Sequence, residues 1–322
     1  MIPIPCTTCI FCIFERKTVF LNLPYSVRNF IMKNFFLKGC GTALFTPFKA
    51  DGSVDEEAFA ATVHRQVEAG IDFLVPLGTT GETPCLSDAE KLRVLSIARE
   101  NAGGRTVVAG VGTNSVDGTL ANIRLLGDAD AFLVVVPYYN KPPQRGIYEY
   151  FRTIAASTPK PVIVYNVPGR TGSNISAETT LRLAADVPNI VGIKEASGNF
   201  EQIEKILEGA PKDFAVLSGN DGDTLPLMKK GAAGVISVAS NVVPNQMVQL
   251  THAILDGNFA TAETIDSRLQ PLYHALFVES NPIPGKAAMH LLGLMENRLR
   301  LPLVPATEET IELLKNVLLK IN

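Results

Sequence analysis

Val191-Gly-Ile-Lys-Glu-Ala-Ser197 is the stretch that decides how this chain folds, because it reads as a short buried strand that ends in a lysine. The apolar run starts near Pro188, and Gly198 with Asn199 predicts a break before the next helix. Burying an ammonium group costs several kcal/mol unless the group is paired or neutralised. Lys194 therefore needs an explanation.

Side chains alternate between the two faces of a strand, so Gly192 and Lys194 are expected on one face. Val191, Ile193 and Glu195 are then expected on the other. If Val191 and Ile193 face covering helices, Lys194 points to the opposite face of the strand, into the interior of the protein. Gly192 on the same face leaves room beside it.

Two interpretations of Lys194 are open at this point. A lysine at a strand end often snorkels to solvent along its apolar stem. Burial instead favours the neutral amine, which is the form that condenses with a carbonyl group to give a Schiff base.

Outward from this strand, short apolar runs alternate with amphipathic stretches from residue 40 onward. Eight runs are predicted as strands: Gly41–Thr46, Phe73–Leu77, Thr106–Gly110, Ala131–Pro137, Pro161–Asn166, Ile190–Glu195, Phe214–Gly219 and Gly234–Val238. The helices predicted between them are Asp55–Ala69, Ser87–Asn101, Ser115–Leu126, Ile147–Ser157, Ser176–Ala185 and Phe200–Glu208. Ser87 and Ser176 are predicted N-caps, and Glu90 completes a capping box with Ser87.

Alternating strands and helices imply a parallel sheet, and eight such units predict an α/β protein with a (β/α)8 TIM barrel over residues 38–243. A doubly wound open sheet is the alternative, but Thr46-Pro-Phe-Lys-Ala-Asp-Gly52 is not its glycine-rich phosphate loop. Residues 244–322 are predicted as a C-terminal helical appendix. Its helices are Pro244–Leu255, Phe259–Phe277, Pro284–Leu294 and Glu308–Leu319.

The composition narrows the class of protein. Of 322 residues 46% are hydrophobic and 19% charged, which is typical of a globular chain with a large core. The net charge of −3 and the lack of a Lys/Arg run argue against nucleic acid or a membrane surface as partner. The four histidines fall in predicted helices without metal-ligand spacing, so no metal site is expected.

Residues 1–31 do not read as part of the fold. They are predicted to be a disordered extension or a mis-assigned start, since Met32 opens a more ordinary beginning. Cys6, Cys9 and Cys12 have a spacing also seen in iron–sulfur ligands, but no suitably spaced fourth cysteine follows. The body of the chain is expected to be cytoplasmic.

Polar groups gather where the predicted strands end, which is where barrel active sites form. The segments are Gly78-Thr-Thr-Gly-Glu82, Pro137-Tyr-Tyr-Asn140, Tyr165-Asn-Val-Pro-Gly-Arg-Thr-Gly172, Lys194 and Ser218-Gly-Asn-Asp221. Taken singly, each has an ordinary interpretation as a turn, a packing aromatic or a solvated arginine. Together they predict one site, in which Arg170 could hold a carboxylate.

These motifs, with Phe277-Val-Glu-Ser-Asn-Pro-Ile-Pro284, resemble the dihydrodipicolinate synthase family of pyruvate-dependent class I aldolases. The resemblance runs from about Lys38 to the C-terminus with the motifs in the same order. Arg170 favours the synthases over the related N-acetylneuraminate lyases, which generally lack this arginine.

The resemblance implies that Lys194 forms a Schiff base with pyruvate, without a cofactor. It implies a proton relay of Thr80, Tyr165 and Tyr139, with Tyr139 supplied by a neighbouring subunit. The chain would therefore be a homo-oligomer, either a dimer or a dimer of dimers (a homotetramer).

The resemblance also implies the substrate contacts. Thr79 and Thr80 would hold the carboxylate of pyruvate, and Arg170 that of L-aspartate 4-semialdehyde. Gly219 and the carbonyl of Ile236 would line the pocket. The product would be 4-hydroxy-tetrahydrodipicolinate, on the route to diaminopimelate and lysine.

Two other functions are weighed against this one. A lyase of the same superfamily could act on neuraminate or a 2-keto-3-deoxy sugar acid, with other groups at the position of Arg170. A barrel that binds a keto acid without catalysis would be expected to lack Lys194 or Tyr165, and both are present.

Feedback inhibition by lysine is expected to be weak or absent. In feedback-inhibited family members, histidines and a glutamate bind the lysine at the dimer interface, and the matching positions here are Asp88, Lys91 and Gly118. Lys91 would repel the ammonium of the ligand. Asn114 and Tyr138 remain and could still bind its carboxylate.

Overall fold

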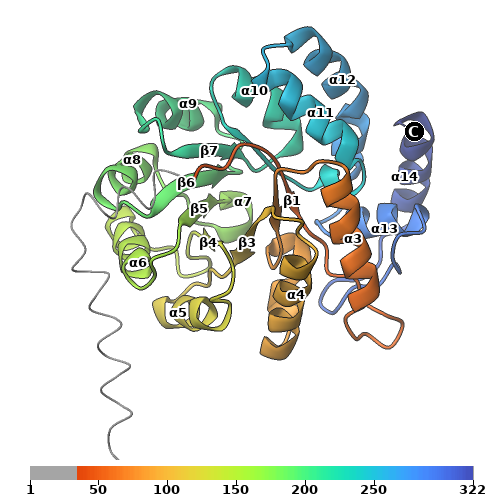
Figure 1. The fold of residues 1–322 in the computed structure, drawn as a ribbon, viewed down its shortest axis with the longest axis horizontal. Coiled ribbons are helices and arrows are strands. Elements are labelled where there is room, and N and C mark those ends of the chain that lie inside the picture. Colours follow the sequence, from red (N-terminus) through yellow and green to blue (C-terminus); the bar gives the residue numbers. More distant parts are fainter. Residues whose placement is uncertain (1–34, 322) are drawn as a thin grey trace, which may run out of the picture.

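The computed structural model describes residues 35–321, and within them eight parallel strands close into a barrel in chain order (Figure 1). The strands are β1 (Gly39–Ala43), β2 (Phe73–Val75), β3 (Thr106–Gly110), β4 (Ala131–Val135), β5 (Val162–Asn166), β6 (Ile190–Glu195), β7 (Ala215–Ser218) and β8 (Gly234–Ser237). β1 pairs with both β2 and β8, so the sheet has no free edge. The predicted TIM barrel is confirmed, and the doubly wound alternative is excluded.

Helices surround the barrel as the periodicity predicts. They are α3 (Glu56–Glu68), α4 (Asp88–Glu100), α5 (Val116–Leu125), α6 (Gln144–Ala156), α7 (Pro168–Thr171), α8 (Ala177–Asp186), α9 (Phe200–Gly209), α10 (Thr224–Lys229), α11 (Pro244–Leu255), α12 (Phe259–Ala275), α13 (Ile283–Leu291) and α14 (Glu308–Ile321). The short helices α7 and α10 were not predicted, because four and six residues carry too little periodicity to be recognised.

The predicted helix starts have the expected chemistry. The Ser87 hydroxyl accepts from the backbone N–H of Glu90, and the Glu90 carboxylate accepts from that of Ser87, which completes the capping box. Ser176 likewise accepts from the backbone N–H of Thr179 at the start of α8. These contacts satisfy amide groups that the first helical turn leaves unpaired.

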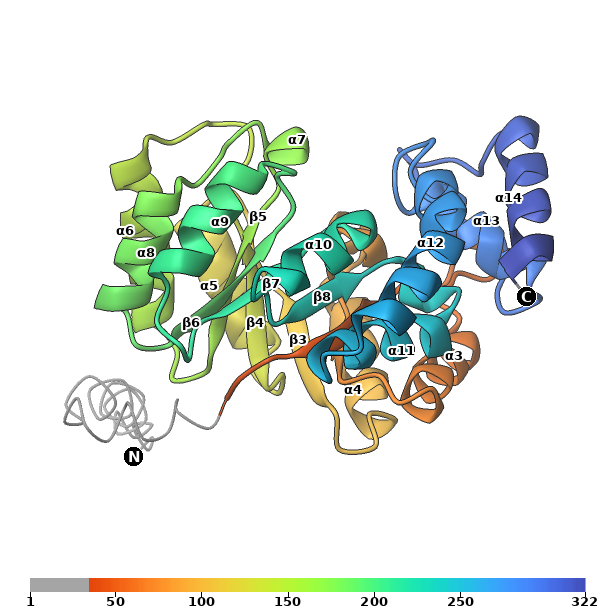
Figure 2. The same cartoon turned by 90° about the horizontal axis from the view of Figure 1, so that it is seen from above.

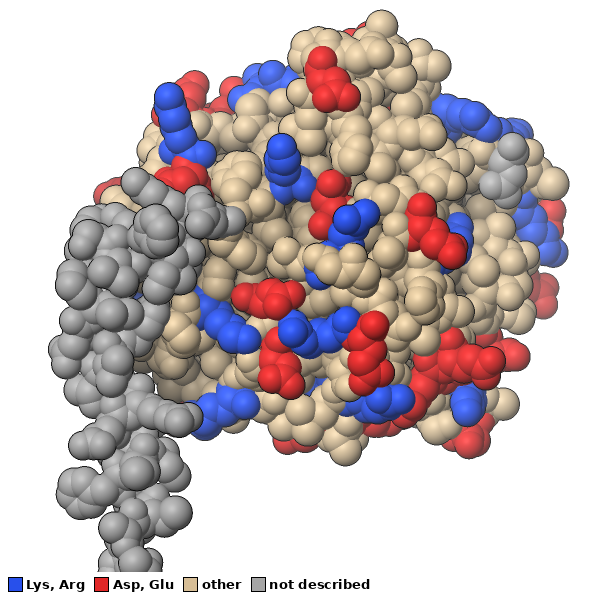
Figure 3. Space-filling view, viewed as in Figure 1, with Lys and Arg blue, Asp and Glu red and all other residues tan. Residues whose placement is uncertain are grey.

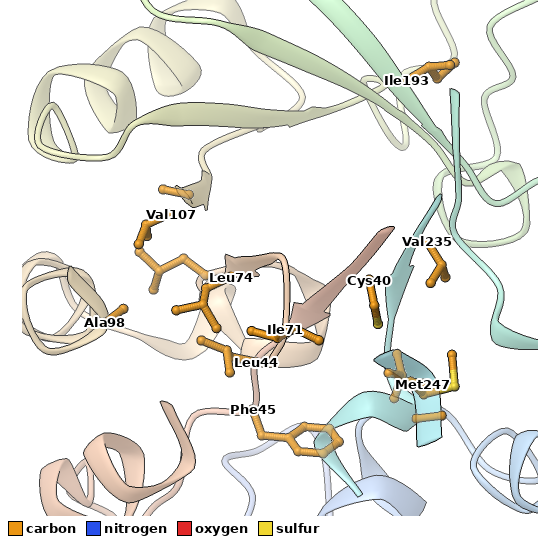
Figure 4. Packing of buried hydrophobic residues seen from close by; sticks show 14 of the residues in the cluster. Cys40, Leu44, Phe45, Ile71, Leu74, Ala98, Val107, Ile193, Val235 and Met247 are labelled. Carbon is orange, nitrogen blue, oxygen red and sulfur yellow. The ribbon is translucent and has the colours of Figure 1, made fainter. Parts of the chain in front are cut away.

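Two layers of apolar side chains lie on the two faces of the sheet. The outer layer packs between strands and helices, and Figure 4 shows Leu74 and Val107 in it with Ala98 of α4. The inner layer fills the barrel with residues such as Phe73, Val108 and Ile163. The interior of this barrel is therefore filled with side chains and forms a packed core, as in other TIM barrels.

The predicted face of Val191 is wrong. Ile193 lies in the outer layer as expected, but Val191 belongs to the inner layer with Ile163. The reason is an irregularity in the β5–β6 pairing, where Val162 pairs with Ile190 while Ile163 pairs with Gly192. One extra residue in β6 shifts the alternation by one position, as a β-bulge does.

The C-terminal helices α12, α13 and α14 lie together at the end of the molecule opposite to α6 and α8 (Figure 2). Helix α11 follows β8 and packs against both β1 and α12. The boundary between barrel and appendix at residues 243 and 244 stays a prediction. The expectations for residues 1–31, including Cys6, Cys9 and Cys12, lie outside the described residues.

Acidic and basic side chains are interspersed on the face shown in Figure 3. Among the helices of residues 35–321, none has the length and the apolar character needed to cross a bilayer.

Candidate active site

A cavity of about 500 Å³, counting the part that is open to solvent, lies at the carboxyl ends of the strands. Its walls bring together residues from distant segments of the chain. The predicted site residues among them are Thr79, Thr80, Tyr165, Arg170, Lys194 and Gly219. Because these side chains surround one small space, they can act on one bound molecule.

Lys194 points into this cavity and is 6% exposed. It pairs in register with Tyr165 of β5 and Leu217 of β7, both of which belong to the inner layer. The Nζ atom of Lys194 lies 4.4 Å from the centroid of the Tyr165 ring. The ring face attracts the charged form of the amine, so Tyr165 both packs against Lys194 and presents its phenol to the same space.

Thr79 and Thr80 lie on a short 3-10 helix, Thr79–Gly81, that follows β2. Thr80 is buried, and its hydroxyl oxygen accepts from the amide nitrogen of Asn281 at 3.0 Å. Its own hydroxyl hydrogen remains available for a proton relay. Thr79 is exposed toward the mouth of the cavity.

Arg170 lies on α7, the single turn that follows β5. Its guanidinium reaches the cavity and donates to the backbone carbonyl of Asn281 at 3.3 Å. A guanidinium at the rim carries further donors for a carboxylate that enters the cavity.

The C-terminal region supplies two cavity residues whose roles the sequence analysis did not assign, Phe277 and Asn281. Asn281 joins the Thr80 hydroxyl to the Arg170 guanidinium through its amide and its carbonyl. The sequence does contain a feature that could have identified Asn281 as a site residue. It is an asparagine between serine and proline that interrupts a helical region.

Two predicted residues do not line the cavity of their own chain. Ile236 is buried in the inner layer, and Val238, two residues further along the chain, lines the wall instead. Tyr139 is 87% exposed and has a positive φ of 74°. A tyrosine held outward in an uncommon backbone conformation fits a role away from its own cavity.

A second hollow adjoins the cavity and shares Thr79, Tyr165 and Arg170 with it. Tyr138 and Lys91 line it. The Nζ atom of Lys91 lies 3.0 Å from an Asp88 carboxylate oxygen.

Two buried carboxyl groups lie next to the site. Burial raises the pKa of Asp221, which accepts from the backbone N–H groups of Val238 and Ala239 and thereby fixes the turn after β8. Burial also raises the pKa of Glu195, on the outer face beside Lys194, where Asn166 donates to both carboxylate oxygens at 3.1 Å. Among residues 35–321, no group of three or more His, Cys, Asp or Glu could hold a metal ion.

Comparison with known proteins identifies close relatives. A 4-hydroxy-tetrahydrodipicolinate synthase of Thermotoga neapolitana is 49% identical over 288 residues, which are 87% of this chain and 97% of the relative. A structure described as the first monomeric dihydrodipicolinate synthase variant has a TM-score of 0.87 at 46% identity and covers 91% of this chain and 98% of its own. An Acinetobacter baumannii dihydrodipicolinate synthase complexed with pyruvate has a TM-score of 0.86 at 38% identity, over 88% and 98% of the two chains.

The family model of the dihydrodipicolinate synthetases matches residues 36–321, nearly the whole described chain. The predicted fold, family and synthase activity, which is a lyase activity, are confirmed by these findings. The neuraminate lyase alternative is correspondingly disfavoured. This chain belongs to the dihydrodipicolinate synthetase family.

Proposed function

We propose that Lys194 is the amine that condenses with pyruvate in the synthase reaction. The supporting observation is its position, since a buried lysine side chain points into the cavity against the ring of Tyr165. The neutral amine attacks the keto carbon, and loss of water leaves an iminium that draws electrons from the adjacent methyl group. The enamine formed on loss of a methyl proton then attacks the aldehyde carbon of L-aspartate 4-semialdehyde. The iminium is the electron sink, so this reaction uses no cofactor.

Tyr165 and Thr80 are proposed to move protons between the reacting atoms and solvent. Both line the cavity with Lys194, and a hydroxyl group can donate and accept in the same step. Thr79 and Thr80 are proposed to hold the carboxylate of pyruvate. Gly219 is the residue that fits in this wall, because a Cβ atom there would lie 2.5 Å from that of Ala196.

Arg170 is proposed to bind the carboxylate of the semialdehyde at the rim. The product would be 4-hydroxy-tetrahydrodipicolinate, in the biosynthesis of diaminopimelate and lysine. The cytoplasmic location stays a prediction.

Tyr139 is proposed to complete the relay from a second copy of the chain. Its exposure and its absence from the cavity wall of its own chain support this arrangement. A dimer, or a tetramer built from dimers, would provide the second tyrosine. A monomeric variant is known among the similar structures, so the oligomeric state needs a direct test.

Borohydride trapping tests the assignment of Lys194. Incubation with pyruvate and borohydride is expected to leave a reduced pyruvyl group on the peptide that contains Lys194, as found by mass spectrometry. Lys194→Ala is expected to remove the label and most turnover while the protein stays folded. A label on Lys160 or Lys286 would refute the assignment.

L-Lysine is expected to inhibit weakly or not at all. Lys91 places a cation in the adjoining hollow, and Gly118 lacks the carboxylate that would pair with the ammonium of the ligand. The measurement is synthase activity over a series of lysine concentrations. Inhibition below about millimolar lysine that is lost in Tyr138→Phe would overturn this expectation.

A further inference from the structure

The turn that carries Thr79 and Thr80 has an uncommon backbone at both ends. Leu77, just before the turn, has a φ of 60°, and Glu82, just after it, has a φ of 53°. Residues with a Cβ atom seldom adopt the left-handed region, and they remain there only where surrounding contacts hold them. The contacts of Glu82 therefore bear on the geometry of the turn.

Glu82 is 2% exposed, and each of its carboxylate oxygens lies against a group of the C-terminal region. One oxygen lies 2.5 Å from the Nζ atom of Lys286 on α13, and the other accepts from the backbone N–H of Arg300 at 3.0 Å. The backbone N–H of Glu82 closes the 3-10 helix by donating to the carbonyl of Thr79 at 3.1 Å. The same residue thus ends the turn and ties it to α13.

Lys286 is completely buried. It donates to the carbonyl of Arg298 at 2.9 Å, and its Nζ atom lies 4.1 Å from the ring centroid of Phe48. Burial lowers the pKa of Lys286 to about 8, although the neighbouring Glu82 carboxylate acts in the opposite direction. A lysine in such a place is costly to keep, and neither it nor Glu82 lines the cavity.

A second link joins the same helix to the same turn. Asn281 lies just before α13 and donates to the Thr80 hydroxyl at 3.0 Å. One contact thus comes from Asn281, just before α13, and reaches Thr80, and the other comes from α13 itself and reaches Glu82. The ion pair with Lys286 is the charged contact among those that hold the turn. The others include the Arg300 N–H on Glu82 and the Thr46 hydroxyl on the Gly81 carbonyl at 2.8 Å.

We infer that the buried Glu82–Lys286 pair is a positioning device, which holds the Thr79–Thr80 turn in the geometry that binds the carboxylate of pyruvate. The inference rests on the proposed binding of pyruvate by Thr79 and Thr80. Arg170 lies on α7 and contacts neither Glu82 nor Lys286, and its one hydrogen bond to this region is to the Asn281 carbonyl, so the site of the second substrate is expected to change much less.

The test is the double variant Glu82→Gln/Lys286→Met, which removes both charges and leaves no unpaired buried ion. The expected result is a folded protein whose KM for pyruvate rises at least about tenfold, as small displacements of binding groups can cause. The KM for L-aspartate 4-semialdehyde is expected to change less than about twofold, by the same argument. Pyruvate concentrations needed for half-maximal borohydride trapping should rise with the pyruvate KM.

Glu82→Gln alone serves as a second variant if the double variant does not fold. Lys286 can lose its proton there, because its pKa is already lowered to about 8. Lys229→Met/Glu263→Gln is the matched control, since this pair joins α10 to α12 and does not line the cavity. The control should leave both KM values unchanged.

Equal rises in both KM values, or an unchanged pyruvate KM in a folded variant, would overturn the inference. The variant Thr79→Val distinguishes a failure of the Glu82–Lys286 inference from a failure of the proposed pyruvate site. If Thr79→Val leaves the pyruvate KM unchanged, the carboxylate site itself is wrongly placed. If it raises that KM while the charge-removal variants do not, only the role of Glu82 and Lys286 is refuted.

Discussion

At the scale of single residues, the proposed site assigns the carboxylates of the two substrates to different side chains. Thr80 is buried, and Thr79 lies toward the mouth of the cavity that Lys194 also lines. Arg170 instead approaches from α7, on another side of the strand ends. A guanidinium forms paired, charge-assisted hydrogen bonds with a carboxylate, which a hydroxyl cannot. The second substrate should therefore depend on Arg170 far more than pyruvate does.

Arg170→Ala is expected to raise the KM for L-aspartate 4-semialdehyde much more than the KM for pyruvate. A hydrogen bond to a charged group contributes roughly 1.5–3 kcal/mol, which corresponds to about ten- to hundredfold in KM. Steady-state kinetics with each substrate varied in turn provide the measurement. Arg145→Ala, an exposed arginine on α6 outside the cavity wall, is the control. Similar effects on both substrates would count against the proposed role.

At the scale of elements, the start of α4 is held by a contact from the C-terminal region. The Glu90 carboxylate completes the capping box with Ser87 and also accepts from the Arg300 guanidinium, with one N–O distance of 2.9 Å. The guanidinium of Arg300 also donates to the carbonyls of Gly52 and Cys85. One side chain thus joins the loop before α3, the loop before α4 and the appendix.

The hydrogen bonds from Arg300 lower the pKa of Glu90 to about 2. A lowered carboxyl pKa in the folded state stabilises the protein above the unfolded pKa, and this contribution is lost as the pH falls from about 4.5 to about 2. Glu90→Gln is therefore expected to lower the free energy of unfolding by roughly 1 kcal/mol at pH 7. Denaturant unfolding at several pH values should show the difference fade over that acidic range.

Glu57→Gln is the control for this prediction. Glu57 is an exposed acid in the first turn of α3, and the described residues offer it no ion-pair partner. Its replacement should have a much smaller effect with little pH dependence. A difference for Glu90→Gln that stays constant down to pH 2 would show that the Arg300 contact does not stabilise the fold.

At the scale of the whole molecule, the proposed relay extends over two chains. Mixed dimers test this directly, because Tyr139→Phe and Lys194→Ala damage different parts of a shared site. A hybrid would contain one site with both Lys194 and Tyr139 intact. Refolding the two inactive variants together is therefore expected to restore activity well above that of either variant alone.

The control mixture combines Lys194→Ala with Tyr165→Phe. Lys194 and Tyr165 line the same cavity of one chain, so no hybrid regains an intact site. Rescue in the first mixture but not in the second supports the shared site. No rescue in either mixture, together with a fully active monomer in ultracentrifugation, would refute it.

Much of this architecture was predictable from the sequence, because the information is local. Alternation with period two and period 3.6 predicts all eight strands and ten of the helices, since burial on one face imposes those periods on apolar residues. The ends of the strands carry polar residues in runs such as Gly78–Glu82, and a parallel barrel brings every such end to one face. The lysine at the end of β6 needed only its own strand to be noticed.

Features that depend on strand pairing and on contacts between distant segments of the chain were decided only by the tertiary structure. The bulge that turns Val191 inward arises from the pairing of β5 with β6, and alternation within one strand cannot reveal it. Asn281 and Phe277 reach the cavity only because α12 and α13 fold back over the barrel. Glu82 and Lys286 each look like surface charges in the sequence, and only their contact in the folded chain makes burial of both groups tolerable.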